Sequence, residues 1–154
     1  MWHIVLFNIL MLAASIYALG WGGAPERVFV LLSAVALYAT IHVHHDGFLK
    51  LEVGLFLVDL AFFCALYLLS LFSTRFWPIW MTALQGLCVL SHAVMLAPLP
   101  EEGFGYAVLE QIWAWPMEML LIVATFRHRQ RLAWTGTDRP WTLSFVRSAR
   151  PNRG

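Results

Sequence analysis

The sequence predicts an all-α fold, an integral membrane bundle of five transmembrane helices with the N-terminus outside and the C-terminus in the cytoplasm. Hydrophobic residues make up 60% of the 154 residues and charged residues only 12%, whereas an ordinary globular chain carries roughly a quarter charged residues. The charges are segregated, which leaves apolar runs of about 18–25 residues, enough to span roughly 30 Å of hydrocarbon. We expect one membrane-embedded domain, residues 1–131, followed by a polar tail, residues 132–154.

The first two helices are predicted at about residues 2–19 and 26–45. A secretory signal should carry Lys or Arg before its apolar region, and the first helix has neither. We therefore expect this helix to be retained in the mature protein. A turn over residues 21–24 joins the two, and Pro25 suits the first position of the second helix.

The other three helices are predicted at about residues 48–72, 76–97 and 104–127. Asp46-Gly47 marks a tight connection before the third helix, and Pro98 and Pro100 end the fourth. The fifth is the most unusual, because its apolar run contains two carboxylates, Glu110 and Glu118, and ends in a cluster of basic residues.

The distribution of Lys and Arg predicts the orientation, because cytoplasmic connections are enriched in them. With five spans, alternate connections share a side. One side receives Arg27, Arg75 and the seven arginines from Arg127 onward, whereas the other receives only Lys50. That other side also carries four acids: Asp46, Glu52, Glu101 and Glu102. We therefore expect a multi-pass protein of the bacterial inner membrane with a cytoplasmic C-terminus.

The tail combines aromatic side chains with arginines, a composition that suits the interface with anionic lipid headgroups. We expect the membrane surface to be contacted by Arg127, Arg129, Arg131, Arg139 and Arg147. The expected partners are the lipid bilayer and either other membrane subunits or further copies of the chain. A nucleic-acid partner is not expected, because a short tail next to the membrane needs none.

Ionisable side chains inside the predicted spans are the best functional clue. Each costs roughly 2.5–3.5 kcal/mol at the bilayer centre, so it usually faces the bundle and finds a partner. Helical spacing places Gln85, Cys88 and His92 on one face of the fourth helix, and Asp59 falls near the middle of the third. We predict an intramembrane polar cluster composed of Asp59, His92, Glu110, Glu118, Gln85 and His42.

Three kinds of chemistry fit such a cluster. A transition metal would take His42, His45 and His92 as ligands, together with Asp59 or Glu110. A b-type haem would need two facing imidazoles, which His42 and His92 supply on parallel helices. A proton or cation path would use the buried acids with His92.

Simpler interpretations stand beside these. His42 and His45 also fit solvated side chains at the interface, and His92 also fits a structural hydrogen bond to an acid. Cys64 and Cys88 both fall within predicted spans without a Cys-x-x-Cys motif, which argues against disulfide or thiol redox chemistry.

The sequence thus leaves two main hypotheses about function. One is an ion- or proton-coupled, or metal- or haem-holding, membrane unit. The other is an accessory or assembly subunit of a larger membrane complex, without chemistry of its own. An enzyme is less expected; one acting on a lipid or isoprenoid would use Glu118 as a proton donor.

Overall fold

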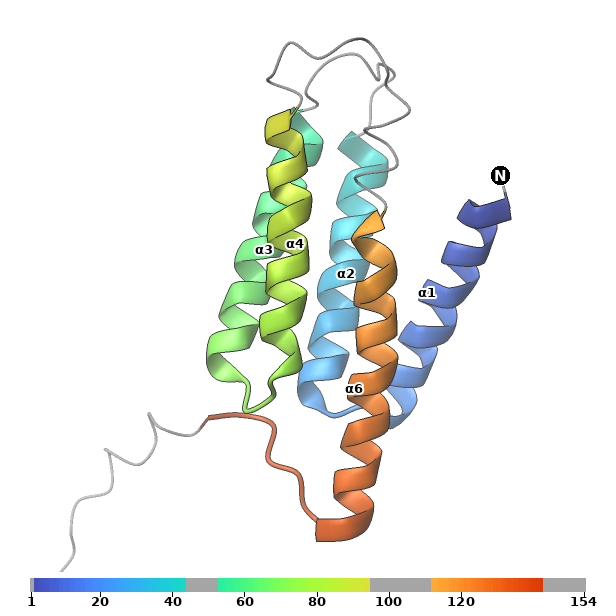
Figure 1. The fold of residues 1–154 in the computed structure, drawn as a ribbon, viewed down its shortest axis with the longest axis vertical. Coiled ribbons are helices and arrows are strands. Elements are labelled where there is room, and N and C mark those ends of the chain that lie inside the picture. The colour runs from blue at the N-terminus through green and yellow to red at the C-terminus, as the bar shows by residue number, and fades with distance from the viewer. Residues whose placement is uncertain (1, 44–52, 95–111, 143–154) are drawn as a thin grey trace, which may run out of the picture.

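A computed structural model describes residues 2–43, 53–94 and 112–142, and these contain five helices and no strand. The prediction of an all-α fold with five helices is confirmed. The helices, shown in Figure 1, are α1 (Trp2–Trp21), α2 (Ala24–Val43), α3 (Val53–Phe72), α4 (Trp77–Val94) and α6 (Ala114–Thr135). The predicted helix portions at 44–45, 48–52, 95–97 and 104–111 lie outside the described residues.

The most informative difference from the predicted boundaries is the length of α6. The sequence predicts that the fifth span ends at about residue 127, and the helix itself continues to Thr135. The basic residues from Arg127 to Arg131 are good helix formers and do not interrupt the backbone pattern. The helix ends instead at Gly136, which adopts φ 68° and donates its N–H to the Leu132 carbonyl at 3.0 Å.

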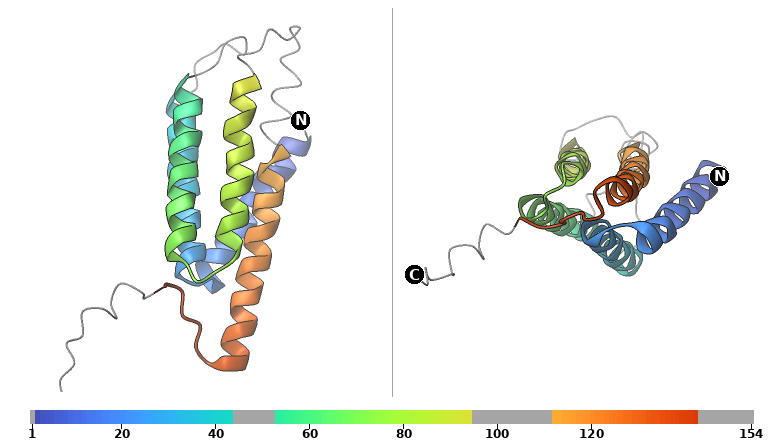
Figure 2. Two further views of the ribbon diagram at one scale, coloured as in Figure 1. Left: turned by 60° about the vertical axis from the view of Figure 1, so that its left-hand side comes forward. Right: turned by 90° about the horizontal axis from the view of Figure 1, so that it is seen from below.

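The helices pack side by side in two layers. Viewed from one end, α1, α2 and α3 form a row, and α4 and α6 lie against one side of it (Figure 2). Helix α3 packs against α2 and α4, and α6 packs against α1, α2 and α4. This arrangement brings α3, α4 and α6 around a common interior.

The core at the layer interface combines small and large apolar side chains. Ala14 and Ala18 on α1 are buried, as is Ala124 on α6, and small residues at such positions let helices approach closely. Phe29 on α2 packs edge-on against Trp77, with ring centroids 6.0 Å apart.

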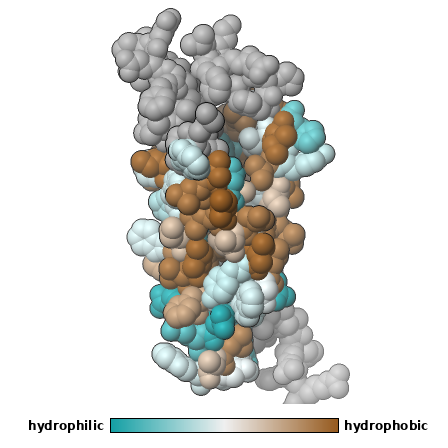
Figure 3. Space-filling model, turned by 90° about the vertical axis from the view of Figure 1, so that its right-hand side faces the viewer, coloured by the Kyte–Doolittle hydropathy of each residue, from teal (hydrophilic) through white to brown (hydrophobic). Residues whose placement is uncertain are grey.

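Much of the apolar surface of the molecule lies outside this core. Two helices, α2 and α3, are long and apolar enough to cross a membrane, yet only 17% and 11% of their most apolar stretches are buried. In α6 the arginines lower the mean hydropathy, and in α1 the continuous apolar stretch whose side chains the structure describes is Val5–Trp21. Figure 3 shows apolar side chains over the middle of one face and hydrophilic residues gathered near its lower end.

The chain after α6 turns back towards the connection between α3 and α4. Thr142 donates its N–H to the Phe72 carbonyl at 2.9 Å, and Thr74 donates its N–H to the Pro140 carbonyl at 3.1 Å. Residues 137–142 are therefore held against the α3–α4 connection. This packing places Asp138 beside Arg75.

Candidate functional site

The centre of the candidate site is a hydrogen-bonded pair between α3 and α4. The Asp59 Oδ2 atom lies 2.8 Å from His92 Nε2. Gln85 donates from Nε2 to Asp59 Oδ1 at 3.0 Å, so both carboxylate oxygens have partners. His92 is almost fully buried at 1% exposure, whereas the Asp59 side chain is 23% exposed. Of the predicted cluster, the structure thus brings together Asp59, Gln85 and His92.

Cys88 belongs to the same group of side chains. One ligand atom each from Asp59, Cys88 and His92 lie within 4.8 Å of one another. A carboxylate, a thiolate and an imidazole are ligands that zinc accepts. The sequence analysis placed Cys88 on the same face as His92 but did not include it among the predicted metal ligands. The four-residue spacing between Cys88 and His92 was the signal that could have added it to the ligand set.

Glu118 on α6 faces this group across a cavity. The cavity has a volume of about 210 Å³, and its polar lining consists largely of Asp59, Gln85, Cys88 and Glu118. Glu118 is buried, and its Oε2 atom has no hydrogen-bond partner within the described part of the chain. A cavity of this size is large enough for water, and the polar groups on its wall can bind it. Asp59 on α3 and Glu118 on α6 therefore line the same cavity.

Among the described residues, His42 is the predicted cluster member that lies apart from this group. His42 is exposed on α2, where its Nδ1 atom lies 2.8 Å from the Tyr38 carbonyl and its ring packs on the Tyr38 ring at 4.1 Å. His42 is thus satisfied within its own helix and does not face His92. The other two predicted residues, His45 and Glu110, lie outside the described ranges.

A second polar group surrounds Asp138 at the basic end of the molecule. Asp138 Oδ2 lies 2.6 Å from His128 Nδ1 and accepts from Arg131 Nε at 3.2 Å, and Oδ1 accepts from Arg75. Burial alone would raise the pKa of Asp138, but the hydrogen bonds from Arg75, His128 and Arg131 outweigh it and lower the pKa to about 2. Asp138 is therefore ionised at neutral pH and compensates the arginines.

The predicted membrane-surface arginines consequently have different environments. Arg131 is paired with Asp138, and Arg129 lies over the Trp21 ring at 5.8 Å. The Arg139 side chain is exposed, and only its carbonyl is engaged, by the Thr74 hydroxyl at 2.6 Å. Arg127 is exposed and has no polar partner among residues 2–43, 53–94 and 112–142. Arg147 lies beyond the described residues.

Glu26 is a buried carboxylate that the sequence analysis did not single out. It has 0% exposure at the start of α2, and its Oε1 accepts from the Trp77 indole N–H at 3.0 Å. Its Oε2 atom has no hydrogen-bond partner in the described part of the chain. The position of Glu26 in the first turn of α2 does not indicate burial, because the helix dipole makes exposed acids common at helix N-termini.

The described residues thus contain an interior site around Asp59 and a basic end around Asp138. Comparison with known proteins finds no matching family model, no matching curated protein and no matching solved structure.

Proposed function

We propose that the chain is a five-span membrane protein whose interior site, at Asp59, His92 and Glu118, passes protons. Membrane insertion is supported by large apolar side chains that face outward on several helices. Ile9 and Leu12 on α1 and Val35 on α2 are each 60–67% exposed. Monomeric soluble proteins rarely expose large contiguous apolar surfaces, whereas lipid chains would cover these side chains.

The orientation is supported by where the basic side chains lie. Arg27 follows the α1–α2 turn, Arg75 lies in the α3–α4 connection, and Arg127 to Arg131 lie near the end of α6. All three places are at the lower end of the molecule in Figure 1. We infer that this end is cytoplasmic, since cytoplasmic segments are enriched in Lys and Arg.

Proton handling is carried by one observation: the Asp59–His92 pair and Glu118 line or adjoin the same cavity. A proton can move between Asp59 Oδ2 and His92 Nε2 over their 2.8 Å separation. Water in the cavity would connect Asp59 to Glu118, because bridging water maintains hydrogen bonds across distances that side chains do not span. Intramembrane acids and histidines commonly mark proton relays.

A purely structural role explains only half of this arrangement. Gln85 and His92 satisfy both oxygens of Asp59, as a structural hydrogen-bond group requires. The Glu118 carboxylate is not satisfied in this way. Its buried Oε2 atom has no hydrogen-bond partner in the described part of the chain, which lowers the stability of the folded state. A role in binding water or protons accounts for a carboxylate at this position.

The experiment is a proton-flux measurement with the purified full-length chain in lipid vesicles that contain a pH-sensitive dye. Wild-type vesicles should dissipate an imposed pH gradient faster than empty vesicles, and Asp59→Asn and Glu118→Gln should each abolish the difference. Ser70→Ala is the matched control, because the exposed Ser70 hydroxyl bonds only the Tyr67 carbonyl at 2.7 Å. Unchanged flux in both carboxylate variants would refute proton handling and favour the accessory-subunit hypothesis.

A second candidate function, metal binding, is favoured by the proximity of Cys88 to the Asp59–His92 pair. Under this alternative the three side chains would hold one transition metal and leave a coordination position towards the cavity. Elemental analysis of the purified chain tests it. A stoichiometric metal that is lost in Cys88→Ser and in His92→Gln would favour this function, and its absence from the wild-type chain would refute it.

A further inference from the structure

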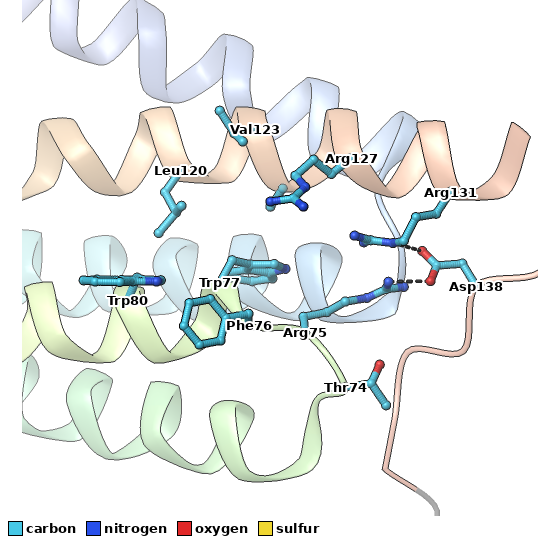
Figure 4. Close-up of a pocket in the computed structure, with 11 residues that line it drawn as sticks. Thr74, Arg75, Phe76, Trp77, Trp80, Leu120, Val123, Arg127, Arg131 and Asp138 are labelled. Carbon is cyan, nitrogen blue, oxygen red and sulfur yellow. Dashed lines mark hydrogen bonds and ion pairs between the residues drawn. The ribbon is translucent and has the colours of Figure 1, made fainter. Parts of the chain in front are cut away.

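A large pocket between α4 and α6 lies apart from the interior site. Its volume is about 640 Å³, and we call it the α4–α6 pocket (Figure 4). Its apolar wall is formed by Phe76, Trp77, Trp80, Leu120 and Val123, and its charged end by Arg75, Arg127, Arg131 and Asp138. The pocket is thus divided into an apolar part and a cationic part.

The cationic part carries an excess of positive charge. Three guanidinium groups, those of Arg75, Arg127 and Arg131, line the pocket with a single carboxylate, so the sum is +3 − 1 = +2. Asp138 is engaged with Arg75 and Arg131, whereas Arg127 has no polar partner in the part of the chain that the structure describes. The buried Nε atom of Arg75 also lacks a hydrogen-bond acceptor there. These unused donors suit a phosphate group, which arginine binds strongly.

The apolar part of the pocket is open to the side of the bundle. Phe76 and Trp80 are 67% and 55% exposed, and in Figure 4 their rings lie across the pocket from Leu120 and Val123. Tryptophan and arginine together are typical of the depth where lipid headgroups meet acyl chains. In the proposed orientation, the cationic end of the pocket therefore lies at the cytoplasmic headgroup level and the apolar wall lies among the chains.

We propose that the α4–α6 pocket binds one anionic phospholipid, with its phosphate at Arg127 and Arg131 and an acyl chain along Trp80 and Leu120. The division of the pocket matches the division of a phospholipid into an anionic and an apolar part. An acidic protein segment would satisfy the arginines, but it would not need an apolar wall open to the bilayer. The proposal requires membrane insertion and is independent of proton handling by Asp59 and Glu118.

The test uses the full-length chain in phosphatidylcholine vesicles that contain a minor fraction of phosphatidylglycerol. Bromine atoms, which quench tryptophan fluorescence at short range, are placed on the acyl chains of one lipid or the other. Brominated phosphatidylglycerol should quench wild-type fluorescence more than its share of the bilayer accounts for, and brominated phosphatidylcholine should not. Trp80→Phe should remove most of this excess quenching, because Trp80 is the exposed tryptophan of the pocket wall.

Two charge-matched variants separate the pocket from general attraction to the membrane surface. Arg127→Gln should lower the relative binding constant for phosphatidylglycerol roughly fivefold, as expected for one arginine near anionic lipid. Arg129→Gln removes the same charge two residues away, but Arg129 packs over Trp21 outside the pocket, so lipid preference should persist.

Three results would overturn the proposal. Equal quenching by the two brominated lipids would show that the pocket has no preference for an anionic lipid. Equal losses in Arg127→Gln and Arg129→Gln would assign the preference to surface charge. Removal of the excess quenching by inorganic phosphate, at matched ionic strength, would assign the cationic part to a free anion. None of these results depends on whether the vesicles show proton flux.

Discussion

Asp138→Asn should weaken the basic end of the molecule, because this carboxylate compensates two arginines and contacts His128. The pKa of Asp138 is lowered from 3.8 to about 2. This difference corresponds to roughly 2 kcal/mol, at about 1.4 kcal/mol for each tenfold change in proton affinity. Removing one partner of a buried ion pair typically costs about 3–5 kcal/mol. Since Arg131 is partly exposed and can reach solvent, we expect a loss of about 2–3 kcal/mol in unfolding free energy.

The assay combines unfolding in detergent with hydrogen exchange at two backbone amides. The N–H groups of Thr74 and Thr142 bond the Pro140 and Phe72 carbonyls, so they report whether residues 137–142 remain docked. Both amides should exchange faster in Asp138→Asn.

Arg139→Gln is the control for this prediction, because it lies in the same segment and its side chain is exposed. It should leave the unfolding free energy and both amides nearly unchanged. If Asp138→Asn behaves like Arg139→Gln in both measurements, the Asp138 group does not hold the segment in place and the reasoning is wrong.

Three further predictions concern stability. In Gly22→Ala, the added methyl group would clash with the backbone carbonyl of Ala18. This clash should lower the free energy of unfolding in detergent by about 1–3 kcal/mol. The control Gly20→Ala should leave the free energy of unfolding nearly unchanged, because a methyl group there meets open space. Trp77→Phe removes the indole N–H bonded to the fully buried Glu26 and should cost about 1–3 kcal/mol; an unchanged melting temperature would contradict this. Since the pKa of Asp138 is lowered, its stabilisation should be complete above about pH 4 and be lost as pH falls towards 2. Wild-type stability should therefore fall more steeply than that of Asp138→Asn across this range.

The residues that sequence reasoning located best are those whose neighbours lie on their own helix. Gln85, Cys88 and His92 share a face because of helical spacing alone, and a short connection makes α3 and α4 adjacent. Their meeting with Asp59 could therefore be anticipated. His42 lies apart from this group in the structure, where its Nδ1 atom lies 2.8 Å from the Tyr38 carbonyl, one turn earlier in the same helix.

The residues that sequence reasoning missed depend on contacts between distant parts of the chain. Asp138 meets Arg75 only because the chain reverses after Gly136 and docks on the α3–α4 connection. Glu26 accepts a hydrogen bond from Trp77, which lies 51 residues later. Helical periodicity describes one helix at a time, so neither contact could be predicted from it.

Proton handling and lipid binding both require that the chain crosses the membrane five times. The direct measurement is labelling of single cysteines with a membrane-impermeant maleimide, in a chain whose Cys64 and Cys88 are replaced by serine. We expect that Lys50→Cys and Glu101→Cys are labelled in intact spheroplasts, whereas Thr137→Cys is labelled only after permeabilisation. Equal labelling of all three before permeabilisation, or recovery of the chain in the soluble fraction, would contradict the five-span arrangement.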